Sequence, residues 1–307
     1  MKIVFMGTPD FSVPCLKALT DNGYDVPAVF TQPDRPKGRG YKMIPPPVKV
    51  TAQEQGIEVY QPLSLRKGED AENAMEILNK ISPDLIIVVA YGQILPKEVL
   101  ELPKYGCINI HASLLPEYRG AAPIQRCILD GKAKTGVTSM MMEEGLDTGD
   151  MLIAAETDID ENETASQLHD RLAVMGAEVL IQTVKAVENG SLEPKKQDDS
   201  LSTYAKMITK EMSALDFNDT AEHIHNVIRG ITGFTMLDGK RLKIYRSRLG
   251  GETQAEAGTV TDKDSFSVAC GDGKTVTFLE VQYEGGKRMS TDSFLRGRKL
   301  TVGQKLG

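Results

Sequence analysis

Cysteine is scarce in this sequence, and long apolar runs are absent from it. Only four of its 307 residues are cysteines and none belongs to a CxxC pair: Cys15, Cys107, Cys127 and Cys270. Scattered cysteines of this kind disfavour structural zinc and a disulfide framework, and they are typical of a reducing compartment. No apolar run approaches the roughly 20 residues that span a bilayer, and no signal peptide stands before the first strand-like segment. We therefore expect a cytoplasmic protein without a membrane partner.

A dinucleotide-binding fingerprint is also lacking. After the apolar segment Lys2–Met6 the chain reads Gly-Thr-Pro-Asp instead of GxGxxG. Pro9 and Asp10 occupy positions where a pyrophosphate needs close approach of the backbone, so a nicotinamide or flavin cofactor is disfavoured. His223 and His225 lie two residues apart on a predicted helix and face different directions, so we expect no metal site either.

Acidic side chains outnumber basic ones, but the excess is uneven along the chain. The formal net charge of −7 argues against non-specific nucleic-acid binding. Residues 206–307 nevertheless carry 16 basic and 13 acidic side chains, and Pro33–Val50 carries five basic residues against Asp34 alone. This second stretch is rich in proline and glycine, so we expect an irregular loop. It is either a solvated loop or a basic finger that contacts phosphates.

Apolar strand-like segments alternate with helical patterns in the first 190 residues. Strands are predicted at Lys2–Met6, Val26–Thr31, Ile57–Tyr60, Asp84–Ala90 and Gly106–Ile110, and helices at Ser12–Asn22, Ala71–Lys80 and Thr164–Asn189. Continuously apolar strands that alternate with helices indicate a parallel sheet covered on both faces. We therefore predict an α/β domain over residues 1–190, with a doubly wound, mostly parallel, Rossmann-like sheet. Its ligand crevice should lie at the carboxyl ends of the strands.

The remaining chain has a different pattern. Residues 191–207 are largely polar and lack periodicity, so we interpret them as a linker. Beyond them a helical pattern at Thr220–Arg229 is followed by short alternating runs between Gly-rich turns. Such runs are typical of a small antiparallel β-barrel, which we predict for residues 208–307.

An amide, an imidazole and a carboxylate belong to the segments around the end of one predicted strand. Asn109 and His111 are two residues apart and so share a face of an extended strand. Asp147, in the sequence Gly-Leu-Asp-Thr-Gly, can reach the imidazole from a neighbouring loop. The set supplies a polar donor, a group that titrates near neutral pH and an orienting charge, but no nucleophile. It predicts transfer between two bound substrates without a covalent intermediate. The alternatives are a structural histidine and, for Gly145–Gly149, a plain turn, because Asp and Gly favour turns.

These motifs resemble those of the methionyl-tRNA formyltransferase family over nearly the whole chain. The matching stretches are Gly7–Phe11, Thr31–Pro36, Gly38–Gly40, Ala90–Pro96, Asn109–Pro116, Tyr118–Gln125 and Gly145–Gly149. The Asn-x-His…Asp core is shared with every enzyme that uses 10-formyltetrahydrofolate as formyl donor, whereas Thr31–Pro36 and Tyr118–Gln125 favour the tRNA enzymes. One departure is that Gly230–Phe234 replaces a family stretch like Asn-Pro-Trp-Pro-Gly, and the chain has no tryptophan.

The resemblance implies a formyltransferase domain joined to an OB-like barrel that binds tRNA. It implies 10-formyltetrahydrofolate as formyl donor, tetrahydrofolate as product, no metal, and the α-amine of methionine on initiator Met-tRNA as acceptor. The recognition mode needs no second subunit, so we expect a monomer.

The resemblance also carries residue roles onto matching positions. The residues it makes catalytic are Asn109, His111 and Asp147, and those lining the folate site are Ser113, Leu114, Leu115 and Pro116. The Asp34–Lys49 loop would insert into the tRNA acceptor arm, with contacts from Arg35, Lys37, Arg39 and Lys42.

Three other functions compete with this one. A formyltransferase for a small amine, such as a nucleotide-sugar or purine precursor, shares the chemistry but needs neither the basic loop nor the barrel. A formyl-folate hydrolase is disfavoured on the same ground. A non-catalytic RNA-binding module has no use for an intact polar core. Folate turnover assayed without RNA separates these classes.

Overall fold

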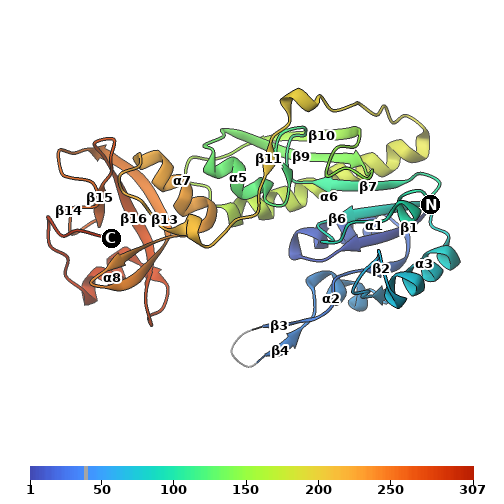
Figure 1. Cartoon of the computed structure of the whole chain (residues 1–307), viewed down its shortest axis with the longest axis horizontal. Helices are drawn as coiled ribbons and strands as arrows, with labels where there is room; N and C mark the ends of the chain where they lie inside the picture. The colour runs from blue at the N-terminus through green and yellow to red at the C-terminus, as the bar shows by residue number, and fades with distance from the viewer. Residues whose placement is uncertain (38–40) are drawn as a thin grey trace. The chain divides into compact units, whose positions relative to one another are not determined.

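The computed structural model describes residues 1–37 and 41–307, and the chain forms two compact units (Figure 1). The first consists of Met1–Gly120, Gly136–Thr157 and His169–Tyr204, and the second of Ala121–Thr135, Asp158–Leu168 and Ala205–Gly307. The division expected from the sequence, at 1–190, 191–207 and 208–307, stays a prediction about folding domains. Within the described ranges, no helix combines the length and the hydropathy needed to cross a membrane.

The first unit is built on a seven-stranded sheet with the order β10-β9-β7-β6-β1-β2-β5. Its strands are β1 (Lys2–Gly7), β2 (Asp25–Phe30), β5 (Glu58–Tyr60), β6 (Leu85–Val89), β7 (Cys107–His111), β9 (Lys134–Met141) and β10 (Met151–Asp158). The neighbours from β7 to β5 are all parallel, whereas β9 runs antiparallel to β7. The predicted mostly parallel sheet of an α/β domain is therefore confirmed.

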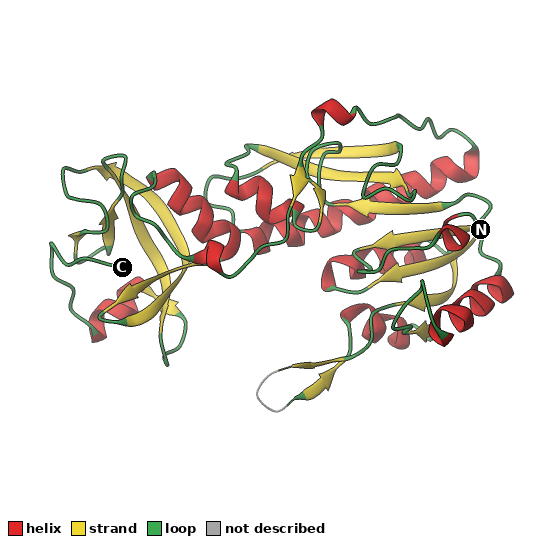
Figure 2. Cartoon of the chain, viewed as in Figure 1, coloured by secondary structure: helices red, strands yellow, loops and turns green. Residues whose placement is uncertain are grey.

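Helices cover this sheet because its central strands are apolar on both faces. All five residues of β6 are buried. On one face α3 (Glu69–Ile81) and α4 (Lys97–Leu100) contribute Leu78 and Val99 to a core that includes Cys107 of β7. On the other face Gly176 of α6 (Ala165–Asn189) packs close to Ile110 of β7 and to Cys15 of α1 (Val13–Asp21). Figure 2 shows these helices around the strands.

The basic stretch 33–50 contains regular structure, so the expectation of an irregular loop is wrong. β3 (Arg35–Lys37) and β4 (Lys42–Ile44) pair as an antiparallel hairpin, and α2 (Pro47–Glu54) follows them. Both strands of a two-stranded ribbon are edge strands, where a proline such as Pro36 need not remove a ladder hydrogen bond. At the base of the hairpin, Lys49 Nζ donates to Asp34 Oδ1 at 2.8 Å and to Gln61 Oε1 at 2.7 Å. The hydrogen bond from Lys49, followed by one from Gln61 Nε2 to Asp34 Oδ1 at 2.8 Å, holds the pKa of Asp34 below its usual value.

The second unit contains an antiparallel sheet with the order β12-β13-β16-β15-β14, and β17 pairs with β16. Its elements are α5 (Pro123–Leu129), α7 (Ala221–Ile231), β12 (Gly233–Leu237), β13 (Lys240–Glu252), β14 (Val260–Asp262), β15 (Ser267–Ala269), β16 (Lys274–Tyr283), β17 (Met289–Ser290) and α8 (Thr291–Gly297). The Thr220 hydroxyl caps α7 by accepting from His223 N at 3.1 Å. Apolar residues of α7 and the sheet, including Ile224, Ile244 and Phe278, share one core.

The expected barrel is an open sheet whose two edges are joined by the C-terminal tail. No ladder between β12 and β14 occurs in the described chain. Gly303 N and Leu306 N donate to Val260 O and Gly258 O at 2.9 Å each, and Gly307 N donates to Met236 O of β12 at 3.2 Å. The sequence of the tail has no alternating apolar pattern, so it gave no sign that the tail lies between the two edges of the sheet. The predicted small antiparallel domain is thus confirmed, but not a closed barrel.

Candidate active site

Strand β7 carries Asn109 and His111 to the carboxyl end of the parallel sheet. Asn109 lies opposite Val88 of β6 and Met140 of β9, and His111 lies opposite Thr138. Strand alternation places both side chains on the same sheet face. In parallel α/β sheets this edge is where ligands bind. Asn109 is partly exposed, and within residues 1–37 and 41–307 its amide has no hydrogen-bond partner, so it is available to a substrate oxygen.

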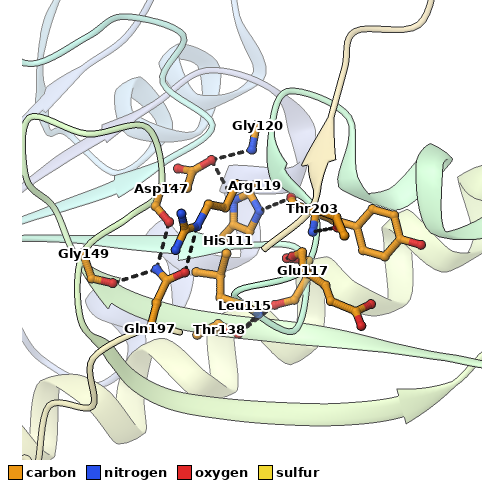
Figure 3. A network of polar contacts seen from close by, with 12 residues as sticks. His111, Leu115, Glu117, Arg119, Gly120, Thr138, Asp147, Gly149, Gln197 and Thr203 are labelled. Atoms are coloured by element: carbon orange, nitrogen blue, oxygen red, sulfur yellow. Dashed lines mark hydrogen bonds and ion pairs between the residues drawn. The ribbon is translucent and has the colours of Figure 1, made fainter. Parts of the chain in front are cut away.

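His111 is buried and contacts a different kind of group at each ring nitrogen (Figure 3). Nε2 lies 2.9 Å from the carbonyl oxygen of Tyr118, and because a carbonyl only accepts, Nε2 carries a proton. Nδ1 faces Asp147 Oδ2 at 3.8 Å. A second proton, on Nδ1, would turn this contact into an ion pair.

Asp147 lies in a tight turn whose glycines are required by space. Its backbone is left-handed, with φ at 53°, a conformation that Asp adopts more readily than most residues. Its Oδ2 accepts from Gly120 N at 2.7 Å. A side chain at Gly149 would lie 1.9 Å from Met141 O, and one at Gly145 would collide with Thr148. The segment is therefore a turn, as the plainer interpretation held, and it also brings a carboxylate to the imidazole.

The expected folate segment Ser113–Pro116 forms a compact turn after β7. Thr138 Oγ1 of β9 donates to Ser113 O at 2.7 Å and accepts from Leu115 N at 3.2 Å. The Ser113 hydroxyl donates to Glu117 O at 2.7 Å, so it is used within the turn. The Ser113 side chain is buried, whereas Leu114 and Pro116 are partly exposed, so these two present the side-chain surface of the segment.

Sequence reasoning missed a group of residues that surrounds this pair: Tyr118, Arg119, Gly120, Gln197 and Thr203. Gln197 Nε2 donates to the carbonyl oxygens of Asp147 and Gly149, at 2.8 and 2.7 Å. Thr203 Oγ1 accepts from Tyr118 N at 2.8 Å. Gln197 and Thr203 belong to the stretch interpreted as a linker, where no periodicity or motif singles them out. The first three lie within the Tyr118–Gln125 motif, which was the available signal.

Three of the four residues expected to contact tRNA, Arg35, Lys37 and Lys42, belong to the hairpin strands β3 and β4. Arg35 and Lys42 are exposed, on β3 and β4, and Arg35 Nη2 is 3.4 Å from Gln32 Oε1. Lys37 is the last residue of β3. Arg39 lies outside the described residues. Tyr41 and Met43 add exposed apolar surface to the same hairpin.

The other histidines and the cysteines have structural surroundings. His225 is buried and bonded to Ser247 Oγ at 2.8 Å and Glu161 O at 2.9 Å, whereas His223 is exposed beside Asp219. Burial raises the pKa of the Cys127 thiol to about 11 and those of the other three cysteines to about 12. These thiols stay protonated near neutral pH. No group of three or more metal-ligating side chains is found in the part of the chain that the structure describes.

Comparisons with known proteins place two domains of one family along the chain. The formyl transferase model matches residues 1–184, and the model of the formyl transferase C-terminal domain matches residues 207–299. A methionyl-tRNA formyltransferase of Geotalea uraniireducens is 50% identical over 312 residues, covering 100% of this chain and 98% of that protein. One of Bacillus subtilis is 49% identical over 313 residues with the same coverage.

A solved structure agrees on the fold. An N-formyltransferase from Helicobacter canadensis, in complex with folinic acid and dTDP-3-aminofucose, matches with a TM-score of 0.68 and 22% identity. The match covers 92% of this chain and 99% of that one.

Proposed function

This chain belongs to the formyl transferase family, and from that membership we propose that it formylates the methionine of initiator Met-tRNA with 10-formyltetrahydrofolate as donor. The observation that carries the proposal is the full-length likeness to enzymes named for the methionyl-tRNA acceptor. A small-amine acceptor would not need the basic hairpin. The products are N-formylmethionyl-tRNA for translation initiation and tetrahydrofolate.

The transfer forms one bond and breaks another. The neutral α-amine attacks the formyl carbon, the bond from that carbon to the folate nitrogen breaks, and one proton passes from the amine to the leaving nitrogen. The formyl oxygen gains negative charge on the way. Asn109, whose amide is free of protein partners in the described chain, donates a hydrogen bond to that oxygen.

His111 and Asp147 serve the proton transfer in this proposal. The Tyr118 carbonyl fixes the proton on Nε2, so a second proton enters the ring at Nδ1, where Asp147 balances its charge. The imidazolium stabilises the oxyanion or relays the proton, and Asp147 positions the water that carries it to the leaving nitrogen. No side chain bonds covalently to the formyl group.

The substrates are assigned to separate parts of the chain. Ser113, Leu114, Leu115 and Pro116 would line the folate site through backbone and apolar atoms. Arg35, Lys37 and Lys42 of the hairpin, together with Arg39, would contact the acceptor arm.

The second unit would bind the tRNA as well. Two of its arginines are stacked on aromatic rings: Arg241 of β13 lies 4.2 Å from the ring centre of Phe234 on β12, and Arg298, directly after α8, lies 4.1 Å from that of Tyr283 on β16. Guanidinium planes held in this way suit phosphates and unpaired bases.

The test offers the protein 10-formyltetrahydrofolate with methionine-charged initiator or elongator tRNA. Formyl-methionine is then quantified after deacylation. Product on the initiator alone supports both the reaction and the acceptor. No product on either tRNA, with folate consumed when small amines are supplied, would assign the chain to the small-amine formyltransferases instead.

A further inference from the structure

The stretch Lys195–Thr203, which we call the strap, contacts the turns that hold both members of the His111–Asp147 pair. It pairs with β10 where Lys195 and Met151 exchange backbone hydrogen bonds of 2.8 and 2.9 Å. Near its other end, Thr203 O accepts from Arg119 N at 2.9 Å. The strap is thereby fixed to the first unit on both sides of Gln197, so the stretch interpreted from sequence as a linker is part of the catalytic unit's polar structure.

We infer that Gln197 is a positioning residue for Asp147, held in place by Arg119, an inference that rests on the proposed function. Its side chain is used at both ends (Figure 3). Nε2 donates to the carbonyls of Asp147 and Gly149, while Oε1 accepts from Arg119 Nε at 2.9 Å. Because carbonyls only accept and a guanidinium only donates, this amide has one orientation and cannot be flipped.

Arg119 is in turn held by the strap. Its Nη2 donates to Asp199 Oδ1 at 2.8 Å, and 11% of its side chain is exposed. A buried guanidinium that contacts two acceptors of the strap has little freedom to move. The contacts of Gln197 are therefore set by the strap and by Arg119 together, and both are fixed on the same unit.

The Asp147 turn depends on such contacts because it has little apolar packing. Residues 143–146 are exposed, and Leu146 is 56% exposed. Asp147 itself is in the left-handed region, so the turn needs outside support to keep its conformation. Two carbonyl hydrogen bonds from one amide, together with the bond from Gly120 N, supply that support.

The strap also acts on His111. Thr203 accepts from the backbone N–H of Tyr118 with its hydroxyl and from that of Arg119 with its carbonyl oxygen. The Tyr118 carbonyl is the group that holds His111 Nε2. The distance between Nδ1 and Oδ2 is thus set from both sides by one segment. A shift of about 1 Å at a reacting group lowers rates by up to about 100-fold, which makes this distance sensitive to the strap.

Two variants of Gln197 test the inference. Gln197→Glu keeps the acceptor for Arg119 but cannot donate to two carbonyls when ionised, and Gln197→Met keeps the volume and removes every hydrogen bond. We expect both to lower kcat for formyl transfer about 10- to 100-fold, with the KM for tRNA changed by less than about threefold. Glu193→Gln, an exposed residue just before the strap, is the matched control and should leave both constants unchanged.

A double-mutant cycle separates positioning from general stability. In the Asp147→Ala background, Gln197→Met should lower kcat by no more than about twofold further, because its effect passes through Asp147. The inference would be overturned if the losses in kcat of the two single variants multiply in the double variant. It would also be overturned if both single Gln197 variants have a normal kcat. A normal kcat in Asp147→Ala itself would instead overturn the catalytic assignment of the proposed function, so the two failures are distinguishable.

Discussion

At the scale of single residues, His111 is constrained more tightly than a catalytic histidine on an exposed loop. Its Nε2 donates a hydrogen bond to a backbone carbonyl, and its Nδ1 faces a carboxylate. In the proposed mechanism a second proton on the ring would therefore lie on the side of Asp147, where its charge is balanced. Asn109 lies on the same face of β7 and is the hydrogen-bond donor of the proposed site.

Removal of the amide at Asn109 should slow the chemical step. We expect Asn109→Ala to lower kcat by about 10²–10³-fold, because an oxyanion donor acts chiefly in the transition state. Single-turnover formylation of Met-tRNA measures this. Asn73→Ala, on the exposed side of α3, is the control and should behave as the parent. Near-normal turnover in Asn109→Ala would contradict the proposed role of Asn109 as oxyanion donor.

His225 should make the second unit sensitive to acid. Burial is the main cause that lowers the pKa of folded His225 below 6.5, and the positive charge of Arg229 lowers it further. The hydrogen bond to the Glu161 carbonyl and the charges of Glu161 and Glu222 act in the opposite direction and raise the pKa. Unfolded His225 therefore binds a proton more readily than folded His225. The contribution of neutral His225 to the free energy of unfolding is complete above pH 6.5 and is lost as the pH falls toward the pKa of the folded state. The free energy of unfolding should change by at most about 1.4 kcal/mol per pH unit, because one proton is involved.

Denaturant unfolding across this pH range tests the effect. His225→Gln should be less stable near neutral pH, since two buried hydrogen bonds change, but its stability should depend less on pH below 6.5. His223→Gln alters an exposed ring and should retain the slope of the parent. The same slope in His225→Gln would show that another group is responsible.

At the scale of elements, sequence patterns were most reliable for a long amphipathic helix and for a continuously buried strand. The helix expected at Thr164–Asn189 is α6, and the buried run at Asp84–Ala90 contains β6. The β3–β4 hairpin was missed because prolines and glycines concealed a short ribbon. The role of Gln197 was missed for a different reason: it depends on contacts 48 and 50 residues away in sequence, which only the fold creates.

The hairpin supplies a prediction about acceptor choice. Arg35→Ala and Lys42→Ala should each raise the KM for Met-tRNA while leaving transfer to a small amine acceptor unchanged, because they remove phosphate contacts remote from the chemistry. Lys80→Ala, on the exposed surface of α3, is the matched control. Equal damage with both acceptors would mean that these side chains support the fold instead.

The C-terminal tail supplies a prediction about stability. Leu306 is buried in the core of the second unit, whereas Val302 on the same tail is 57% exposed. We expect Leu306→Ala to lower the free energy of unfolding by about 2 kcal/mol or more and Val302→Ala by less than about 0.5 kcal/mol. Urea denaturation measures both. Equal small losses would show that the tail does not join the edges of the sheet in solution.

At the scale of the whole molecule, charge is divided along the chain in a way that its net value conceals. Residues 206–307 carry an excess of three basic side chains, and the rest of the chain carries an excess of ten acidic ones. Within the acidic part the hairpin is a local basic exception. A polyanion is therefore repelled by most of the first 205 residues and attracted at the hairpin and the C-terminal region, which favours binding at these two regions over binding anywhere on the protein.

This division predicts a salt dependence that differs between the two substrates. Each phosphate neutralised by Lys or Arg releases counterions, so tRNA affinity should fall by about 10²-fold between roughly 50 and 200 mM salt if about four contacts form. Transfer to a small amine acceptor involves no such release and should change little. Titration of KM against salt for both acceptors measures the difference. If KM depends on salt equally for both acceptors, the salt acts on folate binding or on stability, and the basic regions do not contribute to tRNA recognition.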